Sequence, residues 1–383
     1  MKHENLSRRR LIGAGLAGTI GLTAGLALAS SWAVAQDKQK IKLGFIGPLS
    51  GGNAQQGLGA RNGFLLAIEQ ASAAGYPIAV EGVVLDDASD PQTGVGAALK
   101  LVNDPDIVAA IGHWNSSVAL ATIPVFHRFQ TPFIVWGAIS PAITDQNLPE
   151  VTRVTPTLIT ENQPLAKWAA TQLGAKNIAI VADTSDYGTA NASTFGSFAS
   201  EYGGKVASTD LLPVGTTDFR SVLTKIKGNG ADGIYFGGVI TDAGIFRKQQ
   251  LELGINVPMI GTSGIYDPEF IALAGQAAEG VMVSYPAAQS NPALDKLDAD
   301  YAARGFAEPA SPYTKYAFEA TNILLATIKD VGIQDKVALA KAIRGTKYTG
   351  VLGTTTFDSN GQTQIPIEVE IRIVKDGQWV TRS

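Results

Sequence analysis

The sequence contains no cysteine and only three histidines among its 383 residues. Without cysteine the chain cannot form a disulfide, a thiolate metal site, a catalytic thiol or a lipid-modified cysteine, so packing alone must stabilise the fold. The H-E-x-x-H motif, the G-x-S-x-G motif and the spacing of an EF-hand loop are also absent. These absences exclude the most common templates for hydrolysis and metal binding. We therefore predict no catalytic residue, no metal site and no cofactor.

Charge is scarce as well, at 17% charged residues and a formal net charge of −4. A mildly acidic chain is a poor match for nucleic acids, whose phosphates attract basic surfaces. The hydrophobic content of 45% is typical of a globular α/β protein. A chain of this length usually divides into two domains, each with its own core.

The first 35 residues have the pattern of a twin-arginine export signal. Three arginines at 8–10 precede an uncharged stretch rich in Gly and Ala over 11–29, and Ala33-Val34-Ala35 places small residues where a signal peptidase cleaves. The alternative is a membrane anchor, because about 20 uncharged residues can span a bilayer. The glycines lower the hydrophobicity of the stretch, however, and the cleavage site follows at once. We predict cleavage after Ala35, which leaves a mature chain of formal charge −7 outside the cytoplasm.

Short apolar runs alternate with longer amphipathic runs along the mature chain. This strict alternation predicts an α/β fold with parallel sheets that helices cover on both faces. The predicted strands are 41–46, 80–85, 107–111, 133–136, 178–182, 206–211, 233–236, 259–261 and 281–284. The predicted helices are 57–74, 92–102, 117–129, 162–173, 189–202, 218–227, 242–253, 292–304, 313–331 and 335–344.

The strands fall into two series, which predicts two doubly wound, Rossmann-like lobes. The first break falls near 155–157 and the second near 285–286, and the helices after 286 return to the first lobe. An Asp376-Gly377 turn between alternating segments predicts a C-terminal β-hairpin. We expect lobe one to comprise residues 36–156 and 287–362, and lobe two to comprise residues 157–286 and 363–383.

Two lobes joined by several crossovers form a hinge with a cleft between them. In open α/β sheets, ligands bind beyond the carboxyl ends of the strands, so the loops after the strands are the candidate contacts. The first such loop, 47–57, contains Ser50 and Asn53 and precedes a helix whose N-terminus favours an anion. An ordinary strand-to-helix turn is the alternative for this loop.

The loop after the third strand places Ser116 and Ser117 at the start of an apolar helix. Their hydroxyl and backbone N–H groups can hold a carboxylate, or the serines can simply cap the helix. Trp114 is either an apolar wall of the cleft or a core residue. His113 is either a structural histidine or a ligand contact.

In the second series, Tyr187 follows the fifth strand and could close over a ligand. Asp242 and Asp267 follow later strands, where aspartate caps helices more often than it binds cations. Both residues remain candidates to face a ligand ammonium.

These loops hold an ordered set of short motifs. They are Pro48-Leu49-Ser50-Gly51 with Ala54 and Gly57, Asp86-Asp87-Ala88-Ser89-Asp90-Pro91, Ile111-Gly112-His113 with Ser116-Ser117, Asp183 with Tyr187-Gly188, Tyr235-Phe236-Gly237-Gly238, and Ala278-Glu279-Gly280. The set resembles the periplasmic branched-chain amino-acid-binding proteins of ABC transporters, the leucine/isoleucine/valine-binding family, over nearly all of the mature chain. The resemblance implies a type I two-lobed fold with three crossovers, a ligand clamped by hinge closure, and a periplasmic location.

The resemblance also implies roles for individual residues. Ser116 matches the serine that holds the α-carboxylate in amino-acid binders, and Gly137, followed by Ala138, matches a backbone contact of the next loop. Tyr187 matches a tyrosine of the second lobe that packs on the ligand.

At several positions this chain departs from the family pattern. Ile139 replaces a threonine, Val239 replaces an aromatic residue, and Ser263 replaces the glutamate that leucine binders keep for the ammonium. The family's usual disulfide partners are replaced by Ser89 and Asn115. Burying an ammonium without an anionic partner is costly, so these changes leave room for a carboxylate that lacks an amine, such as an aromatic or aliphatic acid.

We therefore interpret the chain as an exported, monomeric solute-binding receptor for an amino acid or a carboxylic acid, with a membrane permease as its partner. Its ligand contacts would be Ser50, Asn53, Trp114, Ser116, Ser117, Gly137, Ala138, Ile139, Tyr187, Val239 and Ser263. A sensory receptor of the same fold that feeds a signalling partner is the main alternative. An enzyme such as an α/β hydrolase is disfavoured, because nucleophile and dinucleotide motifs are absent.

Overall fold

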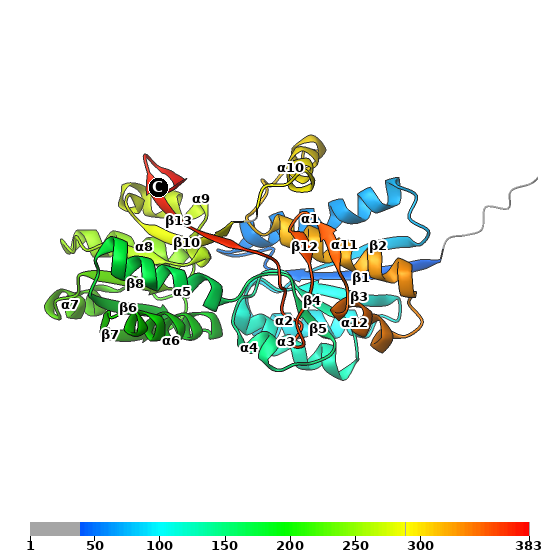
Figure 1. Ribbon diagram of the computed structural model, residues 1–383, viewed down its shortest axis with the longest axis horizontal. Coiled ribbons are helices and arrows are strands. Elements are labelled where there is room, and N and C mark those ends of the chain that lie inside the picture. Colours follow the sequence, from blue (N-terminus) through cyan, green and yellow to red (C-terminus); the bar gives the residue numbers. More distant parts are fainter. Residues whose placement is uncertain (1–38, 288, 383) are drawn as a thin grey trace, which may run out of the picture. The chain divides into compact units, whose positions relative to one another are not determined.

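The computed structural model describes residues 39–287 and 289–382, so the predicted export signal at 1–35 lies outside the described residues. Figure 1 shows two α/β lobes in this part of the chain. Lobe one contains a parallel sheet of five strands in the order β2-β1-β3-β4-β5. Its strands are β1 (Lys40–Gly47), β2 (Ala79–Asp86), β3 (Ile107–Gly112), β4 (Phe133–Val135) and β5 (Val151–Arg153).

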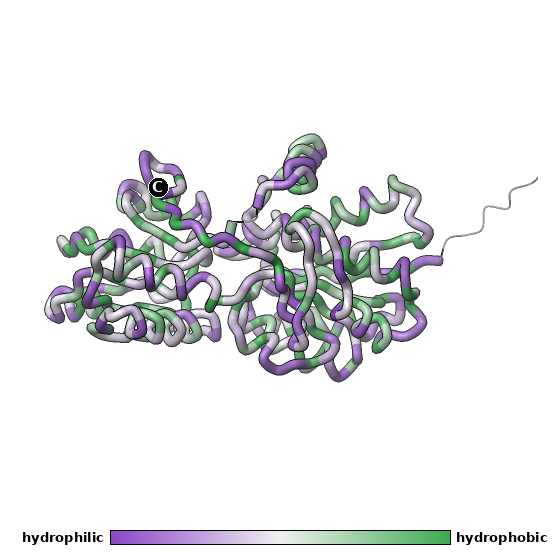
Figure 2. Tube along the Cα trace, viewed as in Figure 1, coloured by the Kyte–Doolittle hydropathy of each residue, from purple (hydrophilic) through white to green (hydrophobic). Residues whose placement is uncertain are grey.

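Lobe two contains seven strands in the order β14-β13-β10-β9-β8-β6-β7. The sheet is parallel except for β13 and β14, which pair antiparallel and form the predicted C-terminal hairpin. The polar turn of this hairpin is the purple tip beside the C-terminus in Figure 2. The strands are β6 (Asn177–Asp183), β7 (Lys205–Leu212), β8 (Gly233–Gly237), β9 (Met259–Gly261), β10 (Met282–Ala287), β13 (Glu368–Lys375) and β14 (Gln378–Thr381).

Helices cover both faces of each sheet, as the alternating pattern predicted. In lobe one, α1, α11 and α12 pack on one face, and α2 and α3 pack on the other. In lobe two, α7, α8 and α9 cover one face, and α5 and α6 cover the other. The helices are α1 (Ala54–Ala73), α2 (Pro91–Val102), α3 (Ser116–Arg128), α4 (Ala142–Asp145), α5 (Leu158–Trp168), α6 (Asp186–Glu201), α7 (Arg220–Gly228), α8 (Ile240–Glu252), α9 (Pro268–Ala274), α10 (Pro292–Arg304), α11 (Thr314–Val331) and α12 (Lys336–Arg344).

The predicted strands and helices all occur, with shifts of a few residues at their ends. The largest shift is in α5, which begins four residues earlier than predicted and continues as a π-helical turn over Ala169–Leu173. The sequence pattern missed the short elements β5, α4 and α9 and the small hairpin of β11 (Tyr348–Gly350) and β12 (Gly353–Thr355). These segments are too short to show a hydrophobic period.

The chain passes between the two sheets three times, after β5, after β10 and before β13. After the second crossing, α11 packs along α1 of lobe one, so the return segment completes the first core. The residue-level lobe boundaries stay a prediction. Among the described residues, no helix combines the length and the hydrophobicity that a membrane span requires.

Gly57 in α1 allows the loop after β1 to pack closely on that helix. A Cβ atom at this position would lie 1.8 Å from the carbonyl oxygen of Pro48, which belongs to the backbone and cannot rotate away. We expect Gly57→Ala to lower the free energy of unfolding by about 2 kcal/mol, as overpacking does elsewhere. Urea denaturation measures this change.

Gly96 in α2 offers the matched control, because nothing lies within 4 Å of a Cβ atom built there. Gly96→Ala should instead stabilise the protein by about 0.5–1 kcal/mol, since alanine restricts the unfolded chain. Equal effects of the two substitutions would contradict the steric explanation for Gly57.

Candidate ligand-binding site

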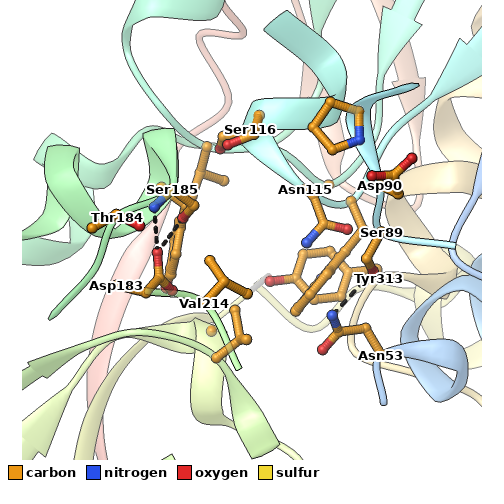
Figure 3. Close-up of a pocket in the computed structure, with 18 residues that line it drawn as sticks. Asn53, Ser89, Asp90, Asn115, Ser116, Asp183, Thr184, Ser185, Val214 and Tyr313 are labelled. Atoms are coloured by element: carbon orange, nitrogen blue, oxygen red, sulfur yellow. Dashed lines mark hydrogen bonds between the residues drawn. The ribbon is translucent and has the colours of Figure 1, made fainter. Parts of the chain in front are cut away.

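A cavity of about 350 Å³ lies between the two lobes at the carboxyl ends of the strands. Lobe one contributes the loops after β1, β2, β3 and β4, and lobe two contributes the loops after β6, β7, β8 and β9. Figure 3 shows side chains of both lobes pointing into this space. Its size suits a small organic molecule.

Six of the described helices begin at this cavity, because the residue directly before each of them lines the space. These residues are Asn53 before α1, Asp90 before α2, Asn115 before α3, Ser185 before α6, Val239 before α8 and Tyr313 before α11. The free N–H groups of a first helical turn and the helix dipole favour a negative ligand group. None of the described lining residues is lysine, arginine or histidine. Any anion held here would therefore depend on N–H and O–H donors rather than on a cationic side chain.

Ser116 is the best-placed hydroxyl for such a group. Its oxygen accepts a hydrogen bond from the backbone N–H of Ser140 at 3.2 Å, which leaves its own O–H free to donate into the cavity. Ser117 also lines the cavity, but its oxygen accepts the backbone N–H of Asp186 at 2.9 Å. This second bond joins lobe one to lobe two.

The walls of the cavity on lobe one are largely aromatic and aliphatic. Trp114 and Tyr313 meet edge to face, with ring centroids 6.1 Å apart, and Ile139 lies beside them in the lining. The indole Nε1 of Trp114 is buried and has no hydrogen-bond partner among the described residues. The indole also interacts with the hydroxyl of Tyr313 and lowers the pKa of that phenol.

Lobe two supplies Tyr187, whose hydroxyl lies 2.8 Å from Oγ1 of Thr262. Its ring packs with Ile139 and Val239, and its hydroxyl leaves no room for a side chain at Gly264. Burial raises the pKa of Tyr187 well above its usual value, so the phenol stays neutral.

Asp183, at the end of β6, is the buried acid of the lining. It accepts hydrogen bonds from the backbone N–H of Ser185 at 2.9 Å and from the hydroxyl of the same residue. Burial raises the pKa of Asp183 despite these bonds. Among the described residues, no group of three or more acids or histidines is arranged to hold a metal ion.

The structure brings eight of the eleven predicted contact residues together around the cavity. They are Asn53, Trp114, Ser116, Ser117, Gly137, Ile139, Tyr187 and Val239.

The other three lie outside the lining. Ser50 is exposed and donates to Asp86 at 2.6 Å. Ala138 is buried, and its carbonyl accepts from Arg153. Ser263 lies behind the cavity, where its N–H and its hydroxyl both donate to Glu161 at 2.8 Å.

The two candidate ammonium partners also lie outside the lining. The carboxylate of Asp242 accepts the N–H of Gly215 at 3.0 Å. Asp267 caps α9 and accepts a hydrogen bond from the side-chain amide of Gln56, which belongs to lobe one. His113 is fully buried between Asp87 and Thr122, so it is structural.

Glu161 was not predicted to be near the site. It lines a second space of about 10 Å³ together with Ser263, and this space shares Ile139 and Tyr313 with the main cavity. Burial raises the pKa of Glu161 to about 7. The family pattern indicated only that Ser263 replaces a glutamate. In the fold, the carboxyl group of Glu161 lies directly behind Ser263 and accepts its hydrogen bonds.

The sequence analysis also missed Asp183, Val214 and Tyr313 as lining residues. Tyr313 precedes α11, far from the other loops in sequence, and only the return of the chain to lobe one brings it to the cavity. Asp183 is the last residue of β6, at the carboxyl end of a parallel strand. Ligands bind at such ends, so this position could have identified Asp183 as a lining residue.

Comparisons with known proteins agree with the two-lobed fold. A family model described as periplasmic binding protein matches residues 40–370. The chain is 29% identical over 342 residues to a leucine-, isoleucine-, valine-, threonine- and alanine-binding protein of Pseudomonas aeruginosa, covering 89% of this chain and 91% of that protein. It is 30% identical over 327 residues to a Leu/Ile/Val-binding protein of Rhizobium johnstonii, covering 84% of this chain and 88% of the relative.

Solved structures show the same fold. A leucine-binding protein of Thermotoga maritima superposes with a TM-score of 0.83 at 26% identity, over 90% of this chain and 98% of that one. A solute-binding protein of R. palustris in complex with 4-hydroxybenzoate superposes with a TM-score of 0.79 at 23% identity, over 90% and 96% of the two chains.

Proposed function

Because the chain belongs to the periplasmic binding protein family, whose members bind solutes and are not enzymes, we propose that it is the solute receptor of an ABC uptake transporter. Its ligand would be a small carboxylic acid with an apolar or aromatic body, held in the cavity between the lobes. The relatives that bind branched-chain amino acids support the transport role. The ligand class rests on the cavity itself.

The observation that carries the proposal is the set of uncharged donors at one cavity. Ser116 has a free O–H, and six of the described helices begin there. Hydrogen bonds from neutral donors and helix N-termini can hold a carboxylate without a cation. The aromatic rings of Trp114, Tyr187 and Tyr313 would cover the apolar part of the ligand.

An amino acid is the second candidate, and Asp183 favours it. This carboxyl group lines the cavity and is the acid that could face an ammonium. A shift of its pKa towards its usual range on binding would accompany such a contact.

Binding would proceed by hinge closure, in which one lobe holds the ligand first and the other then covers it. Bonds between the lobes support this mechanism. Ser117 accepts from Asp186 of lobe two, and Gln56 donates to Asp267 of lobe two. A ligand that contacts both lobes would shift the population towards the closed form.

The remaining features of the proposal concern location and partners. We propose that residues 1–35 direct export to the periplasm, that the mature protein is a monomer, and that its closed form docks on a membrane permease. A signalling partner in place of the permease is the alternative, and the presence of permease and ATPase genes beside this gene would favour uptake.

The first test identifies a ligand and then removes the Ser116 hydroxyl. A thermal-shift screen of residues 36–383 would cover aliphatic amino acids, amides, urea, and aromatic and aliphatic acids, because ligand at ~100 times its Kd adds about 2.7 kcal/mol of stability. For a carboxylate found this way, we expect Ser116→Ala to weaken binding about 10- to 100-fold in isothermal titration calorimetry.

Ser50→Ala is the matched control, because Ser50 lies outside the lining and its hydroxyl donates to Asp86 of lobe one. Its affinity should equal that of the wild type. An unchanged affinity in Ser116→Ala, with the fold intact, would remove the carboxylate contact from the proposal. A ligand without any carboxyl group would overturn the ligand class.

A further inference from the structure

Two asparagines of the cavity occupy helix N-cap positions without capping. Asn53 precedes α1 and Asn115 precedes α3, and neither side chain accepts a hydrogen bond from its helix. Asparagine is among the strongest N-cap residues because its side-chain oxygen normally accepts an N–H of the first turn. Other caps in this chain, such as Asp90 of α2 and Asn291 of α10, do make that bond.

The two amides belong to the cavity instead. Both side chains line it, and the Oδ1 atom of each is buried without a hydrogen-bond partner among the described residues. Asn53 donates through Nδ2 to the hydroxyl of Ser89 at 3.0 Å, and Ser89 also lines the cavity. Figure 3 shows Asn53, Ser89 and Asn115 gathered on the lobe-one side, apart from Asp183 and Ser185.

A buried pair holds Ser89 in this position. Ser89 has a left-handed backbone conformation, with φ of 58°, and its N–H donates to Oδ1 of Asp87 at 2.9 Å. The other oxygen of Asp87 lies 2.7 Å from Nδ1 of the fully buried His113. The bond to the buried Asp87 fixes the backbone of Ser89 and so fixes the position of the Ser89 hydroxyl.

Buried polar atoms without partners are rare in proteins, and a group of them at one end of a cavity indicates a polar occupant. A ligand that excludes water from this end without replacing its hydrogen bonds would bind poorly. An amide presents a donor and an acceptor side by side, so hydroxyl and carboxamide groups, which both donate and accept, complement it in either orientation.

Building on the proposed function, we propose that Asn53, Ser89 and Asn115 form a polar subsite for a hydroxyl or carboxamide group of the ligand, at a distance from its carboxylate. The preferred solutes are then hydroxylated or amide-bearing acids rather than purely hydrocarbon acids. Asn53 and Asn115 determine this preference.

Matched ligand pairs of nearly equal shape test the proposal by isothermal titration calorimetry. Asparagine is compared with leucine, and 4-hydroxybenzoate with 4-methylbenzoate. In whichever scaffold binds the wild-type protein, the polar member should bind at least tenfold more tightly than its hydrocarbon partner. A wild-type protein that binds the hydrocarbon member equally well or better overturns the subsite.

Asn115→Leu and Asn53→Leu test the residues. Each variant should lose most of the polar preference. Each should keep a melting temperature near that of the wild type, because neither side chain makes a capping bond and Asn53→Leu removes only the bond to Ser89. Asn103→Leu is the control, since Asn103 is exposed and its amide bonds only to a backbone carbonyl of its own helix. It should keep the wild-type preference.

The outcomes separate this inference from the proposed function. If some carboxylate binds but the polar preference is absent, or survives in both Asn→Leu variants, the subsite is wrong and the receptor function stands. If none of the four probes and no other small acid binds the wild-type protein, the proposed function fails and the subsite fails with it.

Discussion

Replacing Arg153 by methionine should lower the free energy of unfolding by about 3 kcal/mol and weaken ligand binding, although Arg153 does not line the cavity. The side chain is completely buried. Its guanidinium donates to the carbonyl of Ser140 at 2.6 Å, to the hydroxyl of Thr144 at 2.9 Å and to the side chain of Gln362 at 2.6 Å.

These bonds join three segments of the fold. Ser140 ends the loop after β4 that carries Gly137 and Ile139 to the cavity, and Gln362 lies in the segment that leads to the third crossing. Loss of Arg153 would leave several buried acceptors unpaired, at about 1–3 kcal/mol each. The gain from no longer burying a cation offsets part of this cost. Burial already lowers the pKa of Arg153 to about 9, which reflects that penalty.

Urea denaturation and calorimetry with an identified ligand measure the two effects. Arg153→Lys should be intermediate, because an ammonium cannot reach the acceptors that the planar fork spans. Arg128→Met is the control, since Arg128 is exposed at the end of α3 and its loss should change stability by less than about 0.5 kcal/mol. Wild-type stability and affinity in Arg153→Met would show that the loop does not depend on this residue.

Raising the pH from 4.5 to 8 should destabilise the protein through two buried carboxyl groups. Glu161 accepts from the N–H and hydroxyl of Ser263, and Glu319 accepts from the N–H of Val351 at 2.9 Å and the hydroxyl of Thr355 at 3.0 Å. Burial raises the pKa of both groups to about 7, from an ordinary value of 4.5. Neither group forms a salt bridge with a described residue.

The direction of the effect follows from proton binding. Between pH 4.5 and 7 the folded protein keeps both carboxyls largely protonated, whereas the unfolded chain has released these protons. The folded state binds more protons, so the free energy of unfolding falls as the pH rises through this window and levels off above about 7. Each carboxyl contributes roughly 3 kcal/mol to the fall, as an order of magnitude.

Glu161→Gln and Glu319→Gln isolate these contributions. A glutamine can accept the backbone N–H through its oxygen and donate its amide to the serine or threonine hydroxyl, so both hydrogen bonds survive without a charge. Each variant should match the wild type near pH 4, below the ordinary pKa of 4.5, and exceed its stability at pH 8, which urea denaturation across the pH range measures. Parallel pH profiles for wild type and both variants would sink this explanation.

The sequence by itself determined the α/β class, the two series of strands and the position of the site loops. Runs such as 107–112 are apolar throughout because β3 is buried on both faces, and this makes them visible as strands without any tertiary information. The carboxyl ends of parallel strands lie on one edge, so Trp114, Ser116, Gly137 and Tyr187 could be assigned to one cleft before the fold was known.

Only the tertiary structure decided which polar groups are free to meet a ligand. Asn53 was a predicted ligand contact and Asn115 was not, and only the structure shows that both precede helices without capping them. Asp267, in contrast, is already bonded to Gln56 of the other lobe, and Ser263 to Glu161. Hydrogen bonds between residues far apart in the chain depend on how the lobes pack, and no local pattern encodes that packing.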